Sequence, residues 1–358
     1  MLYPKNTSSE LSQELFESPT CEYRGAPFWA WNCKLDRDEL LRQLDVMNEM
    51  GFGGVHIHVR SGMDTTYLSD EFMDLVRSCS DKTEKDHMLT WLYDEDRWPS
   101  GFAGGYVTKD PQYRIRYLLF TPFPYEEVGA NTVIGNETAA ARRSGLGKLL
   151  CRFDVVLDEN GCLADYRILP DGEEARGRIW YAYIESPRPS PRHNGQTYVD
   201  TLNKKAIERF VEITHEAYKR SVGDKFGKNI PAIFTDEPQF THKSPLRFPD
   251  SLMDVTLPWT DDLEQTFRAA YGAPLTEHIP ELIWELPGDA VSLTRYHYHD
   301  HICERFASAF ADTSGTWCDK NGIMLTGHIM KEPTLESQTS ALGEAMRSYR
   351  SFQLPGID

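Results

Sequence analysis

Three consecutive carboxylates follow a stretch of sequence that is typical of a β-strand. In "WLYDEDRWPSG" (91–101), Asp94, Glu95 and Asp96 come where the strand ends, between Trp91 and Trp98. Carboxylates can grip hydroxyl groups, bind hard cations or transfer protons, and an exposed indole offers a flat surface for stacking. These residue types together suit the recognition of a polyhydroxylated ligand such as a sugar.

Two further carboxylate groups follow later strand-like segments. Asp236 and Glu237 lie near the end of "IFTDEP", and Glu332 comes shortly after His328 in "GHIMKEP". A pair of carboxyl groups can hydrolyse a glycosidic bond when one protonates the leaving oxygen and the other activates water or attacks carbon. Glycoside hydrolysis is therefore the first reaction to consider.

The segment "VHIHVR" (55–60) carries a polar face. Because side chains alternate along a strand, His56, His58 and Arg60 point to the same side. A strand inside an α/β layer is normally apolar on both faces, so such a face is costly unless it lines a ligand site. An earlier strand likewise ends in the polar pair Trp31-Asn32.

The elements that must position these residues alternate between strands and helices. Apolar patterns predict strands at 27–32, 53–60, 88–95, 230–238 and 322–329, and helices between them begin after Asp36 and Ser69. This alternation is typical of parallel strands with right-handed crossovers. Every polar cluster then lies at the carboxyl end of its strand, which is the active-site face of a (β/α)8 barrel.

The barrel pattern is interrupted once and ends early. We expect the first three strands in residues 1–110, a β-rich insertion at 111–198 with a hairpin turn at 158–161, and the continuation of the barrel at 199–358. A sixth strand is expected to start at "PGID" (355–358), so the barrel is incomplete in this chain.

Composition restricts the partners. The formal net charge of −17 argues against binding to nucleic acid or to an anionic membrane surface. No apolar run reaches the ~18 residues of a membrane-spanning helix, and the N-terminus lacks the pattern of a secretory signal. The seven scattered cysteines include no CxxC pair, which indicates reduced thiols and a cytoplasmic location.

Two other functions fit the same residues. His56, His58 and His328 could hold zinc in a metal-dependent barrel hydrolase, although no lysine or further histidine ends the fourth strand, where that layout commonly has one. A non-catalytic carbohydrate-binding fragment is the second alternative. Single residues also have structural interpretations: Asp94 or Asp96 could cap a turn, and either histidine at 56 and 58 could be hydrogen-bonded in the core.

The chain resembles glycoside hydrolase family 106 over roughly residues 20–358. The resemblance rests on "PFWAWN", "GFGGVHIHVRSGMDTTYLSDEFM", "WLYDEDRWPSGFAGG", "YVDTLN", "IFTDEP", "GHIMKEPTLESQT" and "PGID", which occur in this order. It implies an α-L-rhamnosidase-like catalytic (β/α)8 barrel and an inverting mechanism with two glutamates. Glu237 and Glu332 are the matching candidates, with Glu237 expected to be the acid.

The resemblance also implies a calcium ion near the sugar. Asp94, Glu95 and Asp96 are then expected to bind sugar hydroxyls or this cation, with Trp98 as a stacking surface. Tyr93, which precedes this cluster, is expected to contact the substrate. Trp31, Asn32, His56, His58, Arg60, Asp236 and His328 are the remaining residues that we expect to bind substrate.

Family members are usually longer than this chain. The remaining strands of a complete barrel would come from a C-terminal part of the same protein or from another copy in a homo-oligomer, because a partial barrel leaves an open sheet edge.

Overall fold

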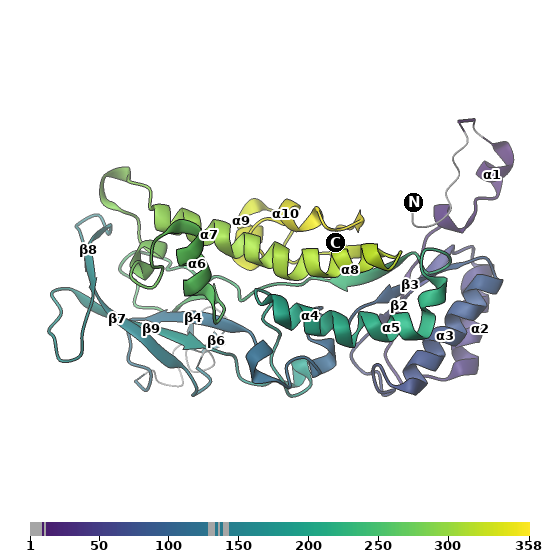
Figure 1. Ribbon diagram of the computed structural model, residues 1–358, viewed down its shortest axis with the longest axis horizontal. Coiled ribbons are helices and arrows are strands. Elements are labelled where there is room, and N and C mark those ends of the chain that lie inside the picture. Colours follow the sequence, from purple (N-terminus) through teal and green to yellow (C-terminus); the bar gives the residue numbers. More distant parts are fainter. Residues whose placement is uncertain (1–8, 11, 128–132, 135–136, 139–142) are drawn as a thin grey trace.

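The computed structural model describes residues 9–10, 12–127, 133–134, 137–138 and 143–358. Within these ranges it contains a six-stranded parallel sheet, a five-stranded antiparallel sheet and a two-stranded hairpin. The antiparallel sheet lies at one end of the long axis, and helices α2 (Arg37–Glu49) and α3 (Asp70–Lys85) lie at the other (Figure 1). No helix in the described ranges is both long enough and apolar enough to span a lipid bilayer.

The parallel sheet positions the polar strand ends. All its strand pairs are parallel, and the strands follow one another in space in the same order as in the sequence. This is the arrangement expected when each strand is joined to the next by a helix or a longer excursion. The strands are β1 (Phe28–Trp31), β2 (Gly54–Val59), β3 (Leu89–Tyr93), β10 (Ala232–Asp236), β12 (Met324–His328) and β13 (Leu354–Pro355).

The sheet is open in the described part of the chain. β13 pairs with Thr326 and Gly327 of β12, close to the sixth strand predicted at 355. Among the described residues β1 and β13 each pair with one strand only, so these strands do not close into the (β/α)8 barrel that the sequence pattern predicts. The structure therefore supports a mixed α/β fold with a parallel sheet.

Helices α2 and α3 begin where the sequence predicts. The Asp36 side chain accepts a hydrogen bond from the Glu39 amide at 2.9 Å, and the Ser69 side chain accepts one from the Phe72 amide at 3.2 Å. Both bonds satisfy amide groups that the first turn of a helix leaves unpaired. The two caps thus fix where the chain turns back after β1 and after β2.

The later helices are interrupted or short. The helical stretch before β10 is divided at Thr214 into α4 (Lys204–Ile213) and α5 (His215–Val222). The region 290–320 is one run of α7 (Leu293–Phe306), a π-helical turn at Ala307–Ala311 and α8 (Asp312–Lys320). The shorter helices are α1 (Gln13–Glu17), α6 (Leu263–Tyr271), α9 (Leu335–Ala341) and α10 (Ala345–Tyr349).

The antiparallel sheet contains the predicted insertion and one strand from outside it. The turn at 158–161 joins β7 to β8 as expected. The edge strand β11 comes instead from the connection after β10, and Pro258 within it is tolerated because an edge strand need not donate every amide. The strand order is β11 (Val255–Trp259), β4 (Arg116–Thr121), β9 (Arg178–Glu185), β7 (Lys148–Leu157) and β8 (Leu163–Ile168), with β5 (Val133–Ile134) and β6 (Glu137–Thr138) as the separate hairpin.

Candidate active site

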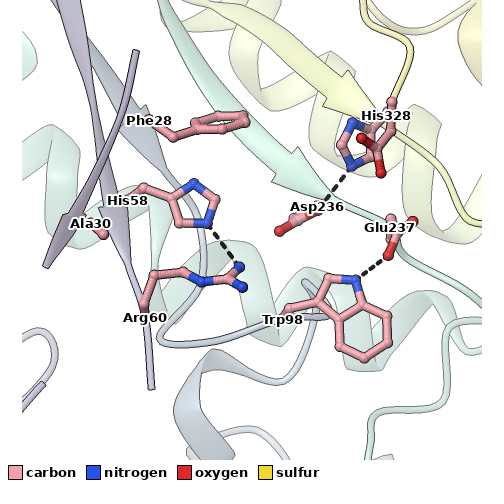
Figure 2. Close-up of a pocket in the computed structure, with 9 residues that line it drawn as sticks. Phe28, Ala30, His58, Arg60, Trp98, Asp236, Glu237 and His328 are labelled. Atoms are coloured by element: carbon pink, nitrogen blue, oxygen red, sulfur yellow. Dashed lines mark hydrogen bonds and ion pairs between the residues drawn. The ribbon is translucent and has the colours of Figure 1, made fainter. Parts of the chain in front are cut away.

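A pocket of about 430 Å³ lies where the parallel strands end. Strand alternation explains its wall on β1, because Phe28 and Ala30 face the pocket while Trp31 packs at 5.7 Å against Phe72 of α3 on the other side. Figure 2 shows Phe28 opposite Trp98, with the charged groups between them. The pocket is lined by Phe28, Ala30, His58, Arg60, Trp98, Asp236, Glu237, His328 and Asp358.

Asp236 is the hub of a buried hydrogen-bond network. Its Oδ1 lies 3.0 Å from Nε2 of His328, and its Oδ2 accepts a hydrogen bond of 2.9 Å from the Tyr93 hydroxyl. Burial lowers the pKa of His328, but the hydrogen bond and the negative charge of Asp236 outweigh it and the pKa is raised. His328 can therefore carry a positive charge beside the pocket, held in orientation by a carboxylate.

Glu237 has its carboxyl group at the pocket wall and an unusual backbone conformation. Its φ of +46° lies in the left-handed region, which is uncommon for a residue other than glycine. Its amide donates to the His328 carbonyl at 3.0 Å, and its Oε2 accepts a hydrogen bond from the Trp98 indole (Figure 2). Burial raises the pKa of Glu237 and the Trp98 hydrogen bond partly opposes that, with Asp236 and Asp358 adding to the rise.

His58 is a buried, neutral residue that lines the pocket. The Arg60 guanidinium lies 3.2 Å from its Nε2, so that nitrogen accepts the hydrogen bond and the proton resides on Nδ1. The imidazole stacks on Tyr93 with ring centroids 4.2 Å apart. Burial lowers the pKa of His58 to about 4, so this ring is uncharged at neutral pH.

His56 does not line the pocket. Its Nδ1 bonds to the Ala26 carbonyl at 3.1 Å, and its ring stacks on Trp91 at 5.0 Å. Among the described residues, the group with metal-ligand spacing is Glu237, His328 and Asp358, whose ligand atoms lie within 4.8 Å of one another. The predicted zinc set of His56, His58 and His328 is therefore not brought together, because His56 is held beneath the pocket by its backbone and aromatic contacts.

Glu95 supports a loop instead of facing the pocket. Its side chain is fully buried, and one oxygen accepts the amides of Gly101, Phe102 and Ala103 at 2.8–3.0 Å. The other oxygen accepts the amides of Gly104 and Asp96 at 2.5 and 2.9 Å. Burial raises the pKa of this carboxyl group, and the amide hydrogen bonds counteract that shift.

The two neighbouring carboxylates also have partners within the chain. Asp94 accepts from the Ser100 hydroxyl at 2.5 Å, and Asp96 accepts from Arg97 and Asn194, both at 2.9 Å. Calcium prefers six to eight oxygen ligands around one point, and these carboxylates point to different partners. The prediction that Asp94, Glu95 and Asp96 bind sugar hydroxyls or a cation does not fit this geometry. Their hydrogen bonds instead hold the loop that carries Trp98.

Three other predicted residues lie outside the pocket wall. Trp31 is buried against α3, and Asn32 is exposed beyond the end of β1. Glu332 accepts hydrogen bonds from the Tyr349 hydroxyl, from an amide at 3.2 Å, and from the Asp358 amide at 3.2 Å. It therefore lies next to Asp358, which lines the pocket, and is not itself part of the wall.

Sequence reasoning missed three residues of the pocket, Phe28, Ala30 and Asp358. Phe28 is an exposed aromatic on the same face of β1 as Ala30, and strict alternation from the buried Trp31 could have identified it. Asp358 follows β13 at the carboxyl end of the sixth strand, the position that identified the other carboxylates. All three could have been identified from the strand pattern alone.

Comparison with known proteins supports the fold. No protein-family model matches the chain, and no curated protein matches it either. A solved structure, the rhamnosidase from Novosphingobium sp. PP1Y, superposes with a TM-score of 0.57 over 96% of this chain at 13% sequence identity. The alignment covers 49% of that rhamnosidase, so the chain spans about half its length. The chain thus shares the fold of the corresponding part of that rhamnosidase.

Proposed function

We propose that this chain is the catalytic part of a glycoside hydrolase of the family 106 type, with a (β/α)8 barrel as the complete fold and an α-L-rhamnoside as substrate. The observation that carries the proposal is the Glu237 carboxyl group in the pocket wall, with a raised pKa and an indole donor on one oxygen. Such a group holds a proton more readily than an ordinary glutamate, as a general acid must. The rhamnosidase fold supports the choice of sugar.

Each pocket residue has a role in this mechanism. Glu237 protonates the oxygen of the leaving group while the sugar carbon gains positive charge. The exposed faces of Phe28 and Trp98 offer apolar surfaces to the sugar ring. Asp236 and His328 are available to exchange hydrogen bonds with sugar hydroxyls, and Tyr93 holds Asp236 in position.

The second carboxylate must stand farther away. An inverting enzyme needs its two carboxyl groups roughly 6.5–9.5 Å apart, so that water fits between the base and the sugar carbon. Asp358 is too close, because its ligand oxygen lies within 4.8 Å of that of Glu237. We therefore retain Glu332 as the proposed base, which must exchange its hydrogen bond with Tyr349 for one with water, and assign Asp358 to raising the pKa of Glu237.

Release of an aryl group from an aryl α-L-rhamnoside tests the two-glutamate assignment. We expect Glu237→Gln and Glu332→Gln each to lower kcat at least about 100-fold, a loss of roughly 2.7 kcal/mol in transition-state stabilisation. Glu71→Gln, which alters an exposed carboxylate paired with Lys34, serves as the matched control and should retain full activity.

Three outcomes would count against the proposal. Retention of more than a tenth of the wild-type kcat by both glutamine variants would remove the two-glutamate mechanism. Activity that disappears with a chelator and returns with zinc would favour the metal-dependent hydrolase. Saturable binding of rhamnosides without turnover would favour the carbohydrate-binding fragment. The anomer first released, followed by NMR, tests inversion separately.

A further inference from the structure

A second, smaller pocket adjoins the candidate active site. Its volume is about 180 Å³, and its lining is Arg60, Ser61, Arg97, Trp98 and Arg192. It shares Arg60 and Trp98 with the larger pocket, so the two cavities meet at these side chains. Three guanidinium groups therefore surround one small cavity of a chain whose formal net charge is −17.

Two of these three guanidinium groups have no carboxylate partner among the described residues. Arg97 is paired with Asp96, its Nε lying 2.9 Å from the carboxylate. Arg60 is held at 3.2 Å by the neutral His58 imidazole, and the guanidinium carbon of Arg192 lies 4.1 Å from the centroid of the Trp98 ring. Within the described ranges neither Arg60 nor Arg192 forms an ion pair with a carboxylate. Both are thus held in place by uncharged partners.

Trp98 connects this cavity to Glu237, the proposed acid. Its indole donates to Glu237, its ring carries Arg192, and its side chain lines both pockets. In Figure 2, Arg60 and Trp98 lie on the side of the pocket away from Phe28, with Trp98 reaching to Glu237. A general acid must contact the oxygen of the leaving group. We therefore expect the leaving group to lie beside the cavity that Trp98 connects to Glu237.

We propose that this arginine pocket binds the carboxylate of a hexuronic acid, which forms the leaving-group side of the glycosidic bond cleaved beside Glu237. The inference rests on the proposed glycosidase function and adds the substrate class, a neutral sugar linked to an acidic one. A planar carboxylate matches the two parallel N–H donors of a guanidinium, and it supplies the negative partner that Arg60 and Arg192 do not have among the described residues.

Two matched substrates test the proposal by hydrolysis. One is a disaccharide of an α-L-rhamnosyl residue on a hexuronic acid, and the other is the same disaccharide with the carboxyl group reduced to an alcohol. We expect the wild-type protein to have a kcat/KM at least about tenfold higher for the acidic substrate. In Arg192→Gln this ratio should fall towards one, and in Arg192→Lys, which keeps the charge but loses the paired donors, it should be intermediate.

Arg247→Gln is the matched control, because this arginine lies outside both pockets. It should keep the wild-type ratio, and thermal melting should show that all variants fold. A ratio near one in the wild-type protein, or a ratio unchanged in Arg192→Gln, would overturn the proposal. A stronger preference for a disaccharide carrying a sulfate ester would also overturn it and assign the pocket to sulfated sugars.

A binding experiment tests this proposal separately from the proposed hydrolysis. Calorimetry with free glucuronate and galacturonate requires no turnover. We expect binding to the wild-type protein that weakens at least about tenfold in Arg192→Gln and also weakens with added salt. If no substrate is hydrolysed but uronate binding depends on Arg192, the glycosidase mechanism fails and the anion site stands. Absence of uronate binding to the wild-type protein would remove the site.

Discussion

Glu95 and Glu237 are both glutamates just beyond the carboxyl end of a parallel strand, yet their carboxylates have different surroundings. Glu95 is enclosed by five backbone amides, whereas Glu237 receives one indole hydrogen bond and faces a pocket. The difference arises from the loop that follows each strand. Residues 101–104 fold back over Glu95 and donate their amides to it, whereas the chain after β10 leaves the Glu237 carboxyl group at the pocket wall.

Replacement of Glu95 by glutamine should destabilise the protein strongly. The glutamine amide would place N–H groups against backbone N–H donors, leaving buried donors unpaired at a cost of roughly 1–3 kcal/mol each. We expect the free energy of unfolding to fall by more than about 3 kcal/mol, measured by urea denaturation. Glu71→Gln, at an exposed ion pair, should change it by less than about 1 kcal/mol. A small change in Glu95→Gln would show that the loop does not depend on this carboxylate.

The residues of the pocket were predictable as a group but not in their individual roles. Period-two alternation and strand ends identified His58, Arg60, Asp236, Glu237 and His328, all of which line the pocket. The same reasoning also selected Glu95 and Asp96, because spacing does not reveal which backbone amides a carboxylate will meet. Hydrogen-bond partners depend on how the following loop folds, and loop conformation is set by contacts far apart in the sequence.

At the scale of elements, patterns of apolar residues located most strands and helices. The strands of the parallel sheet occur close to their predicted ranges, and the caps of α2 and α3 are as expected. β11 was missed because five residues with an internal proline carry little signal, and its pairing with β4 is a long-range contact. The alternation of strands and helices could not decide whether the sheet closes, because it indicates which strands are adjacent but not whether the first and last strands pair.

His215 links three helices and should make stability sensitive to acid. It begins α5, its ring lies 5.5 Å from Phe210 of α4 and 5.0 Å from Trp317 of α8, and its Nδ1 lies 2.8 Å from the Thr214 hydroxyl. Burial lowers its pKa to about 3. Between the ordinary value of about 6.5 and this one, the unfolded chain binds a proton that the folded chain does not, so stability falls as pH decreases.

Substitution of His215 by leucine should remove this contribution. At pH 5 the histidine costs on the order of 2 kcal/mol relative to pH 7.5, from about 1.5 pH units at 1.36 kcal/mol each. We therefore expect the wild-type protein to lose more stability than His215→Leu between pH 7.5 and pH 5, as followed by urea denaturation at each pH. Equal losses in the two proteins would mean that His215 is protonated in the folded state.

At the scale of the whole molecule, an aromatic cluster ties the antiparallel sheet to the segment between α6 and α7. Trp284 lies 5.0 Å from Trp180 of β9 and 6.1 Å from Phe120 of β4, and its indole donates to the Pro249 carbonyl at 2.8 Å. Trp284 is 3% exposed, so the cluster is closed to solvent. These contacts join parts of the chain that the sequence alone assigned to separate regions.

Truncation of Trp284 should weaken this connection without changing the candidate active site. Trp284→Ala should lower the free energy of unfolding by about 3–5 kcal/mol, the usual cost of removing a buried large aromatic side chain. Phe248→Ala, at an aromatic that is 58% exposed, is the control and should cost much less. Rhamnoside turnover, where present, should keep its KM in both variants. A loss below about 1 kcal/mol in Trp284→Ala would indicate that the two regions are held together elsewhere.

The pairing of β11 with β4 has a consequence for synthesis on the ribosome. β4 ends at Thr121, but its neighbour β11 does not begin until Val255. At about 5–20 residues per second, the gap lasts roughly 7 to 27 s, during which that side of β4 has no strand to pair with. An unpaired edge rich in leucine and phenylalanine is a site where nascent chains associate. The antiparallel sheet is thus a part of this protein for which a chaperone that shields strand edges would matter.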